Sequence, residues 1–136
     1  MKSDTTTSNI TPVVSLPMPF ADDRGVIQTL VNGGIHAVQI ISSKTGSVRA
    51  NHYHRQDSHY MYVVSGKMRY IERPAESDLP ATWTFVGAGQ LVYTPSMVEH
   101  AVEFVEDTVF LNITGKSREQ SDYEGDLVRV KLYPQE

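Results

Sequence analysis

The sequence predicts an all-β fold, built as a sandwich or a barrel. Short runs of β-branched and aromatic residues recur along its 136 residues, and Gly, Pro, Asp and Asn separate one run from the next. Many runs alternate apolar and polar residues with the period of two that a half-buried strand requires. Their spacing of about 8–12 residues is typical of sandwiches and barrels.

The expected strands follow one another in chain order. They are VIQTL (26–30), IHAVQIIS (35–42), SVRANHYH (47–54), YMYVVSG (60–66), KMRYIER (67–73), TWTFV (82–86), QLVYTP (90–95), EHAVEFV (99–105), TVFLNIT (108–114) and LVRVKLY (127–133). Only KSREQSDYE (116–124) is compatible with a short helical turn near the C-terminus. Residues 1–10 are polar and rich in Ser and Thr, so we expect a flexible arm there and a single domain over residues 11–136.

Composition excludes several classes of function. Without any Cys, the chain can form no disulfide, no thiolate zinc site and no Cys nucleophile. The first residues lack the apolar run of a secretory signal, and no stretch of about 18 apolar residues could span a membrane. The formal net charge of −4 disfavours nucleic acid, which usually requires a basic face. We therefore expect a cytoplasmic protein with a small-molecule ligand.

Four of the five histidines form a pattern suited to binding a metal ion. His52 and His54 are two residues apart, so on a strand both side chains point to the same face. A short turn at 55–58 would bring His59 back at the start of the next strand, and His100 lies on a later predicted strand. Imidazoles that converge inside a barrel are suitable ligands for a divalent transition metal.

The stretch around the first three of these histidines resembles the first sequence motif of the cupin family. That motif has a Gly, a His-x-His pair, a further ligand that is usually Glu, and a closing Gly. The residues that stand at these places, with the family's spacing, are Gly46, His52, His54, His59 and Gly66. The family's Glu is therefore a His in this chain.

A later stretch resembles the second cupin motif, which runs from a Gly through a Pro to a His. Gly89, Pro95 and His100 match it at the expected spacing. The usual Gly after the Pro is Met97, and the usual terminal Asn is Phe104. Both motifs in order, separated by a suitable gap, indicate a cupin jelly-roll barrel.

The resemblance implies one divalent metal held by His52, His54, His59 and His100. With His59 in place of Glu, the implied ligands are all uncharged nitrogens. Such a set favours Zn²⁺, Ni²⁺, Cu²⁺, Fe²⁺ or Co²⁺ over Mg²⁺ and Ca²⁺. His59 has a second interpretation, as an acid or base or a substrate contact beside a metal that only three histidines hold.

A narrower resemblance, carried mainly by VRANHYH (48–54), is to the cupins that act on sugar nucleotides. These are the dTDP-4-dehydro-6-deoxysugar 3,5-epimerases and 3,4-ketoisomerases, which abstract a proton next to a ketone. By position, His52 would match their base. Arg49 would match the residue that holds an anionic group of the substrate.

The catalytic set of that group is incomplete here. The epimerases carry a catalytic Tyr on a late strand, whereas TVFLNIT (108–114) has none. Tyr70 and Tyr93 lie on predicted strands and are candidates for the acid, with ordinary aromatic packing as the alternative. Met61 and Phe104 are expected to line the pocket as apolar walls.

Together these features predict a metal-binding cupin that acts on a small polar metabolite such as a keto-sugar. The reaction would be an isomerisation, epimerisation or dehydration, with the metal as Lewis acid. A non-catalytic module that binds a metal or a small ligand, and an Fe²⁺ dioxygenase, are the alternatives. Small cupins often dimerise by exchanging N-terminal strands, so the resemblance also implies a homodimer, with TPVVSL (11–16) as a candidate for that strand.

Overall fold

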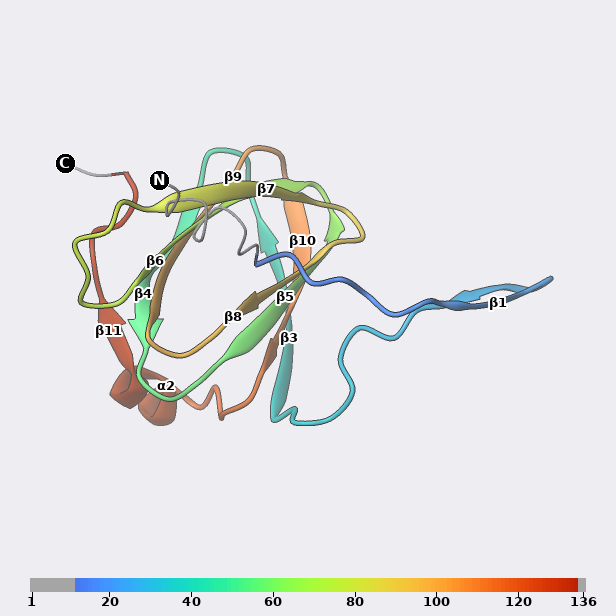
Figure 1. Cartoon of the computed structure of the whole chain (residues 1–136), viewed down its shortest axis with the longest axis horizontal. Coiled ribbons are helices and arrows are strands. Elements are labelled where there is room, and N and C mark those ends of the chain that lie inside the picture. Colours follow the sequence, from blue (N-terminus) through green and yellow to red (C-terminus); the bar gives the residue numbers. More distant parts are fainter. Residues whose placement is uncertain (1–11, 135–136) are drawn as a thin grey trace, which may run out of the picture.

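Two antiparallel sheets enclose the barrel in this computed structural model, which describes residues 12–134 (Figure 1). The arm predicted over residues 1–10 lies outside the described residues. The strands are β1 (Phe20–Asp22), β2 (Gly25–Ile27), β3 (Ala37–Ser43), β4 (Val48–His54), β5 (His59–Ser65), β6 (Lys67–Pro74), β7 (Thr82–Gly87), β8 (Leu91–Thr94), β9 (Val98–Phe104), β10 (Thr108–Thr114) and β11 (Leu127–Arg129). A helix, α2 (Gln120–Asp126), lies between β10 and β11.

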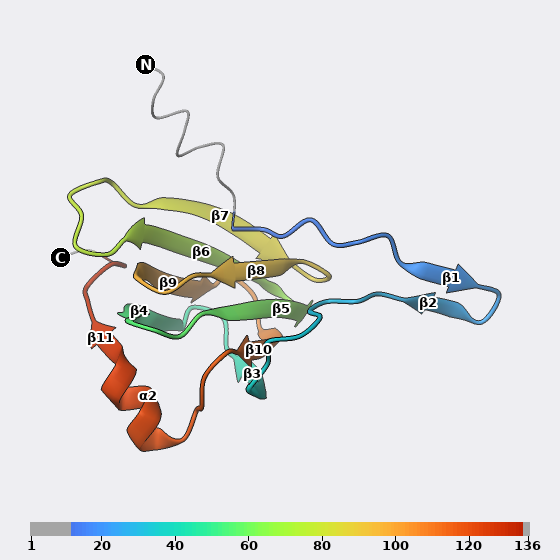
Figure 2. The same ribbon diagram turned by 60° about the horizontal axis from the view of Figure 1, so that its bottom comes forward.

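The strand order shows how distant parts of the chain meet. One sheet runs β3-β10-β5-β8 and the other β11-β4-β9-β6-β7, while β1 and β2 form a separate hairpin (Figure 2). The all-β jelly-roll prediction is confirmed, because each predicted strand segment overlaps a strand. The predicted helical turn is α2.

The differences from the predicted elements lie near the two ends of the chain. β1 was not predicted, and the DDRG sequence forms the turn of its hairpin, where Asp22 accepts a hydrogen bond from the backbone N–H of Arg24 at 2.9 Å. β11 ends at Arg129, well short of the predicted residue 133. The reason is Asn51, whose side chain binds the backbone beyond β11 in place of a partner strand.

The segment expected to exchange between subunits pairs within its own chain. Val13 forms an antiparallel bridge with Val92 of β8. The backbone N–H of Val14 donates to Leu91, and that of Tyr93 donates to Pro12. Residues 12–14 therefore cover the free edge of β8 of their own chain, and the exchange of this strand between two subunits stays a prediction.

The core fills the space between the two sheets at one end of the barrel. Inward-facing residues from β5, β6, β7, β8, β9 and β10 form it, as the alternation of the strands requires. Its buried members are Met61, Val63, Met68, Tyr70, Val86, Val92, Val102, Phe104 and Phe110. Met61, Val102 and Phe110 also line the cavity that holds the histidines, so the core and this cavity adjoin.

An irregularity in β4 sets the position of the histidines on that strand. Ala50 and Asn51 have positive φ angles of 73° and 58°, and the pairing of β4 with β9 shifts its register there. Such a bulge inserts a residue and re-aims the side chains that follow it. After the bulge, His52 lies directly opposite His100.

Gly66 of the first motif joins β5 to β6 in a conformation and a space that only glycine fits. Its φ is +97°, in the region that L side chains rarely adopt. A Cβ at this position would also collide with the carbonyl oxygen of Asp107 and with Thr108. Glycine at this position is therefore needed for the turn from β5, the strand that begins at His59, to β6.

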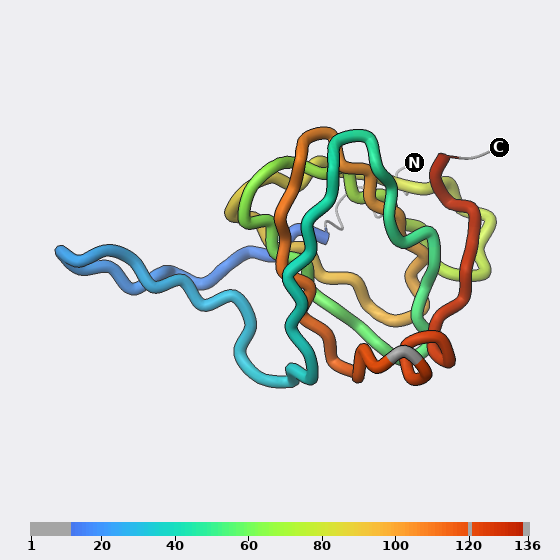
Figure 3. Tube along the Cα trace, turned by 180° about the vertical axis from the view of Figure 1, so that it is seen from behind, coloured from blue at the N-terminus to red at the C-terminus, as the bar shows by residue number. Residues whose placement is uncertain are grey.

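The β1–β2 hairpin projects away from the barrel, as the views from both sides show (Figures 1, 2 and 3). All its residues are exposed, including Phe20, Val26 and Ile27. Within residues 12–134, no helix has the length and apolar character needed to cross a membrane.

Candidate metal centre

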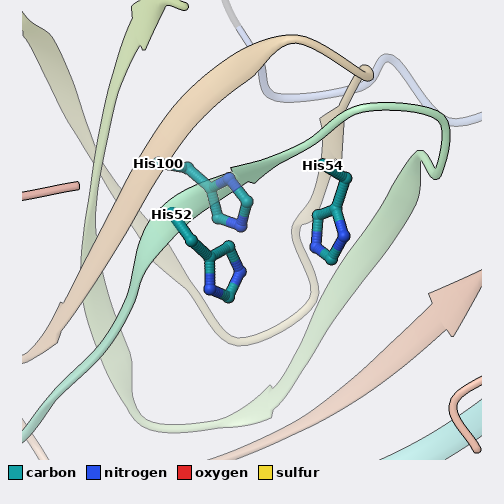
Figure 4. Close-up of side chains that lie close together, drawn as sticks. All are labelled: His52, His54 and His100. Carbon is teal, nitrogen blue, oxygen red and sulfur yellow. The ribbon is translucent and has the colours of Figure 1, made fainter. Parts of the chain in front are cut away.

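Histidines from three strands line a cavity of about 350 Å³ inside the barrel. Among the described residues, those whose ligand atoms all lie within 4.8 Å of one another are His52, His54 and His100. β4 supplies the first two and β9 supplies the third (Figure 4). The structure therefore brings together three of the four predicted ligands, namely those supported by strand alternation and by the two motifs.

All three imidazoles lie in surroundings that favour their neutral forms. Burial lowers the pKa of His52 to about 3, and the neighbouring His54 adds to the effect. Burial likewise lowers the pKa of His54 to about 4 and that of His100 to about 3. A neutral imidazole has a free lone pair, so near neutral pH these side chains are ready to bind a metal without losing a proton.

Contacts on the other ring nitrogens fix the orientation of two of these histidines. The Nδ1 of His100 lies 3.2 Å from the carbonyl oxygen of Val98, which leaves its Nε2 for the cavity. The Nδ1 of His54 lies 3.5 Å from Oδ2 of Asp126. Metal-binding histidines typically donate their second N–H to a carbonyl or carboxylate. The His100 contact has this form, whereas Asp126 lies close to His54 without accepting a hydrogen bond from it.

His59 lies beside the three-histidine set but outside it. Its Nε2 is 3.3 Å from the Nε2 of His100. Burial, followed by the neighbouring His100, holds the pKa of His59 well below its usual value. Two ligands of a tetrahedral ion with bonds of 2.0–2.1 Å are separated by about 3.3–3.4 Å, so this spacing fits a fourth ligand as well as a hydrogen bond between the rings.

The C-terminal segment adds a wall that the sequence did not predict. Tyr123 of α2 lies over the histidines of β4, with ring centroids 6.2 Å from His52 and 5.9 Å from His54. The guanidinium of Arg118 lies 5.0 Å from the Tyr123 ring and also lines the cavity. One sequence signal was available, because Tyr123 is the single aromatic residue in the polar stretch between β10 and β11.

A network of charges attaches this segment to the turn after β4. Arg118 lies 3.3 Å from the buried Asp57, and Asp57 accepts a hydrogen bond from the backbone N–H of Gly115. Asp126 accepts hydrogen bonds from the backbone N–H groups of Gln56 and Asp57 at 2.8 and 3.0 Å. Asp126 of α2 and Asp57 of the turn therefore hold α2 against the histidine site.

Two of the remaining predicted residues line the cavity and three do not. Arg49 and Met61 line it. Tyr70 is fully buried, and its hydroxyl is 2.7 Å from the hydroxyl of Thr94. Tyr93 packs against Tyr60 with the rings tilted by 45° and their centroids 4.8 Å apart.

Phe104 is the third predicted residue away from the cavity. It is fully buried in the core and stacks on Phe110, with ring centroids 5.7 Å apart. The expectation that Phe104 lines the pocket is thus corrected. It shares the inward face of β9 with His100, but it lies four residues further along the strand, or roughly 13 Å away.

Comparison with known proteins agrees with this architecture. A model of the cupin domain matches residues 39–114, which contain all four histidines of the site. A search of curated proteins finds no match.

Several solved structures share the fold at low sequence identity. QdtA, a sugar 3,4-ketoisomerase from Thermoanaerobacterium thermosaccharolyticum, is 16% identical with a TM-score of 0.65, and the match covers 82% of each chain. The rmlC epimerase of Mycobacterium tuberculosis is 12% identical with a TM-score of 0.67, over 84% of this chain and 66% of that one. The capsular polysaccharide assembling protein CapF of Staphylococcus aureus is 22% identical with a TM-score of 0.63, over 85% of this chain. The chain spans only 34% of the length of CapF.

Proposed function

This chain belongs to the cupin family, and from that premise we propose that it is a metal-dependent cupin that acts on a carbonyl group of a small polar metabolite, such as a keto-sugar. His52, His54 and His100 would hold one divalent transition metal. The observation that carries the proposal is the convergence of these three neutral imidazoles within 4.8 Å in one cavity.

The residues present fit such an ion. Three nitrogen donors with an open position are the usual arrangement of a catalytic zinc site. Nitrogen donors without a carboxylate favour Zn²⁺, Ni²⁺, Cu²⁺, Fe²⁺ or Co²⁺. When bound, the metal would polarise a carbonyl oxygen and so ease removal of a proton from the adjacent carbon.

The neighbouring side chains have roles that follow from their positions. The Nε2 of His59 lies 3.3 Å from the Nε2 of His100, and we assign His59 the role of an acid or base beside the metal. Met61 gives the cavity an apolar wall that limits the access of water. Arg49 lies at the rim, where Ser43 accepts a hydrogen bond from its Nε at 2.7 Å, and its guanidinium can bind an anionic group of the ligand.

The class of ligand is supported by the structural neighbours. QdtA has been crystallised with TDP and with TDP-4-keto-6-deoxyglucose. A keto-sugar carries the carbonyl group that the proposed chemistry needs, and its nucleotide carries the negative charge that Arg49 would bind. We infer that a sugar of this kind is the ligand class to test first.

A non-catalytic metal-binding module is the second candidate, and one observation favours it. The 3.3 Å between the Nε2 atoms of His59 and His100 equals the separation expected of two ligands of one tetrahedral ion. If His59 joins the other three, the ion is closed by four imidazoles and has no position for a substrate.

One variant separates the two candidates. We propose to measure the metal content of protein purified without an affinity tag, for the wild type and for His59→Ala. For the enzyme, the wild type should hold close to one ion per chain, and His59→Ala should retain it while losing turnover of the keto-sugar. Loss of the ion from His59→Ala would favour the closed site, and less than about 0.1 ion per wild-type chain after metal reloading would overturn the proposal altogether.

We further propose that the chain forms a homodimer through the β1–β2 hairpin. Val26 and Ile27 are each 66% exposed and Phe20 is 60% exposed, on a two-stranded hairpin of a kind that is only marginally stable alone. A second copy that covers these side chains would stabilise the hairpin. Light scattering should show a dimer for the wild type and a monomer for Val26→Asp with Ile27→Asp, and a monomeric wild type at high concentration would contradict this.

A further inference from the structure

The cavity has a polar corner that the metal site does not use. Asn112 of β10 and Gln39 of β3 are partners across adjacent strands, and both side chains line the cavity. The Nδ2 of Asn112 donates a hydrogen bond to Oε1 of Gln39 at 3.0 Å. Neither residue has a role in the site described above.

Asn112 holds a hydrogen-bonding group that the protein leaves unpaired. The residue is 8% exposed, and its Oδ1 is buried with no hydrogen-bond partner. An unpaired buried acceptor lowers stability, because it has lost its hydrogen bonds to water and gained none in the protein. The residues beside it on the cavity wall, Met61 and Phe110, are apolar, and an apolar side chain at position 112 would avoid this cost.

The chemistry of the unpaired atom selects the ligand group that can pair with it. A carbonyl oxygen needs a donor, which a hydroxyl supplies and a carboxylate, phosphate or ketone does not. If both amides were turned over, Asn112 would present an N–H instead, and a hydroxyl would still pair with it because it also accepts. A hydroxyl is thus the group that fits in either orientation.

The strand register places this corner within reach of the histidines. Asn112 lies opposite Met61 of β5, and His59 lies two residues along the same strand. Diagonal neighbours of this kind are separated by about 7–8 Å. A ligand that has its carbonyl at the histidines and a hydroxyl at Asn112 therefore has the dimensions of a monosaccharide.

We propose that Asn112, supported by Gln39, forms a hydroxyl-recognition subsite that selects a polyhydroxylated sugar over a simple keto acid or carboxylate. The inference rests on the proposed function and deepens it, because it assigns the part of the cavity that reads the sugar. Asn112 would set specificity and would not take part in proton transfer.

The test compares two ligands that differ by the sugar. We would measure by calorimetry the affinities for TDP-4-keto-6-deoxyglucose and for TDP, using zinc-loaded wild type and Asn112→Leu, which has a similar volume. Asn32→Leu, at an exposed position outside the cavity, is the matched control. Zinc content and the melting temperature of each ligand-free variant complete the set.

We expect Asn112→Leu to bind the keto-sugar at least tenfold more weakly, because the hydroxyl loses its partner. Its affinity for TDP and its zinc content should stay within twofold of the wild type, and its melting temperature should not fall. Equal keto-sugar affinity in the two proteins, or equal losses for both ligands, would overturn the subsite while the proposed function stands. A wild type that binds zinc but prefers TDP to the keto-sugar would overturn the subsite and the sugar ligand together.

Discussion

Replacing Asp126 with Asn is expected to weaken zinc binding by roughly 10- to 60-fold, although Asp126 would not touch the metal. Its Oδ2 lies 3.5 Å from the Nδ1 of His54, one of the three proposed ligands. A carboxylate at that position favours the tautomer with hydrogen on Nδ1, which leaves the other nitrogen free for the ion. It also makes that nitrogen a stronger donor.

The magnitude follows from the distance. Two full charges 3.5 Å apart attract by about 5 kcal/mol at an effective dielectric constant of about 20. The N–H of a neutral imidazole carries only part of a charge, so about a third to a half of that energy, roughly 1.5–2.4 kcal/mol, is a reasonable share. At about 1.4 kcal/mol per factor of ten, this gives the expected range.

The assay is competition for Zn²⁺ with a chelating indicator, with the stability of the metal-free protein measured in parallel. Asn at position 126 keeps one oxygen, which can still accept from the backbone N–H of Gln56, but it loses the oxygen that accepts from Asp57. The parallel stability measurement separates this loss in the turn from the loss of charge beside His54. Asp122→Asn removes the same charge from an exposed position on the same helix and should change the affinity by less than twofold. Equal affinities for wild type and Asp126→Asn, or an equal loss in Asp122→Asn, would refute the reasoning.

Two further predictions concern stability. The metal-free protein should lose at least about 4 kcal/mol of unfolding free energy between pH 7.5 and 5.5, at about 1.4 kcal/mol for each of three histidines treated as independent. His59, whose pKa is also lowered, adds to this loss, and a flat profile in urea titrations would contradict the prediction. The sign follows because burial lowers the folded-state pKa values of His52, His54 and His100 to about 3–4, so the unfolded chain binds more protons below pH 6.5 and the loss continues down to those values. Gly66→Ala should cost more than about 2 kcal/mol in the same titrations, whereas Gly46→Ala, with a similar φ of +88° but no atom within 4 Å of its Cβ, should cost only about 1 kcal/mol. Equal costs for the two glycines would show that the contact with Asp107 does not matter.

The sequence was most informative where a rule connects spacing to direction. His52 and His54 are two residues apart on a strand, and this alone predicts that they share a face. The bulge at Ala50 and Asn51 precedes both histidines, so it changes which residues of β9 they lie opposite but leaves them on the same face of β4. The succession of strands along the chain was also predictable, because turn residues mark the ends of the strands.

Whether a side chain reaches the cavity could not be predicted where this depends on the register between strands. Tyr93 adjoins Thr94, which pairs with His59, so Tyr93 points to the opposite face of the sheet. Phe104 points to the inward face of β9, as predicted, but it lies too far along the strand to reach the cavity. The alternation of side chains along a strand predicts the face of a residue and not its distance from the site. Tyr70 is inward and stacks at 6.4 Å from the ring of His100, yet its hydroxyl points to Thr94.

The contribution of α2 was out of reach for a different reason. The helix is short, and its position depends on tertiary contacts of Asp57, Arg118 and Asp126, which are spread over two segments about 60 residues apart in the sequence. No local pattern links such residues. Only the isolated Tyr123 in a polar stretch indicated a buried contact.

The change from Glu to His at position 59 links these features. A carboxylate among the ligands would cancel part of the charge of a divalent ion, whereas neutral imidazoles leave that charge intact. Arg118 also lines this cavity, but its charge is balanced by its partner Asp57, so the uncompensated charge would be that of the metal. A cavity of this kind, with a metal bound, favours a ligand oxygen that gains negative charge, such as a polarised carbonyl, over one that stays neutral. The variant His59→Glu should therefore reduce the Lewis acidity of the site while keeping four potential ligands. It distinguishes the affinity of the site for the metal from the ability of the metal to activate a carbonyl.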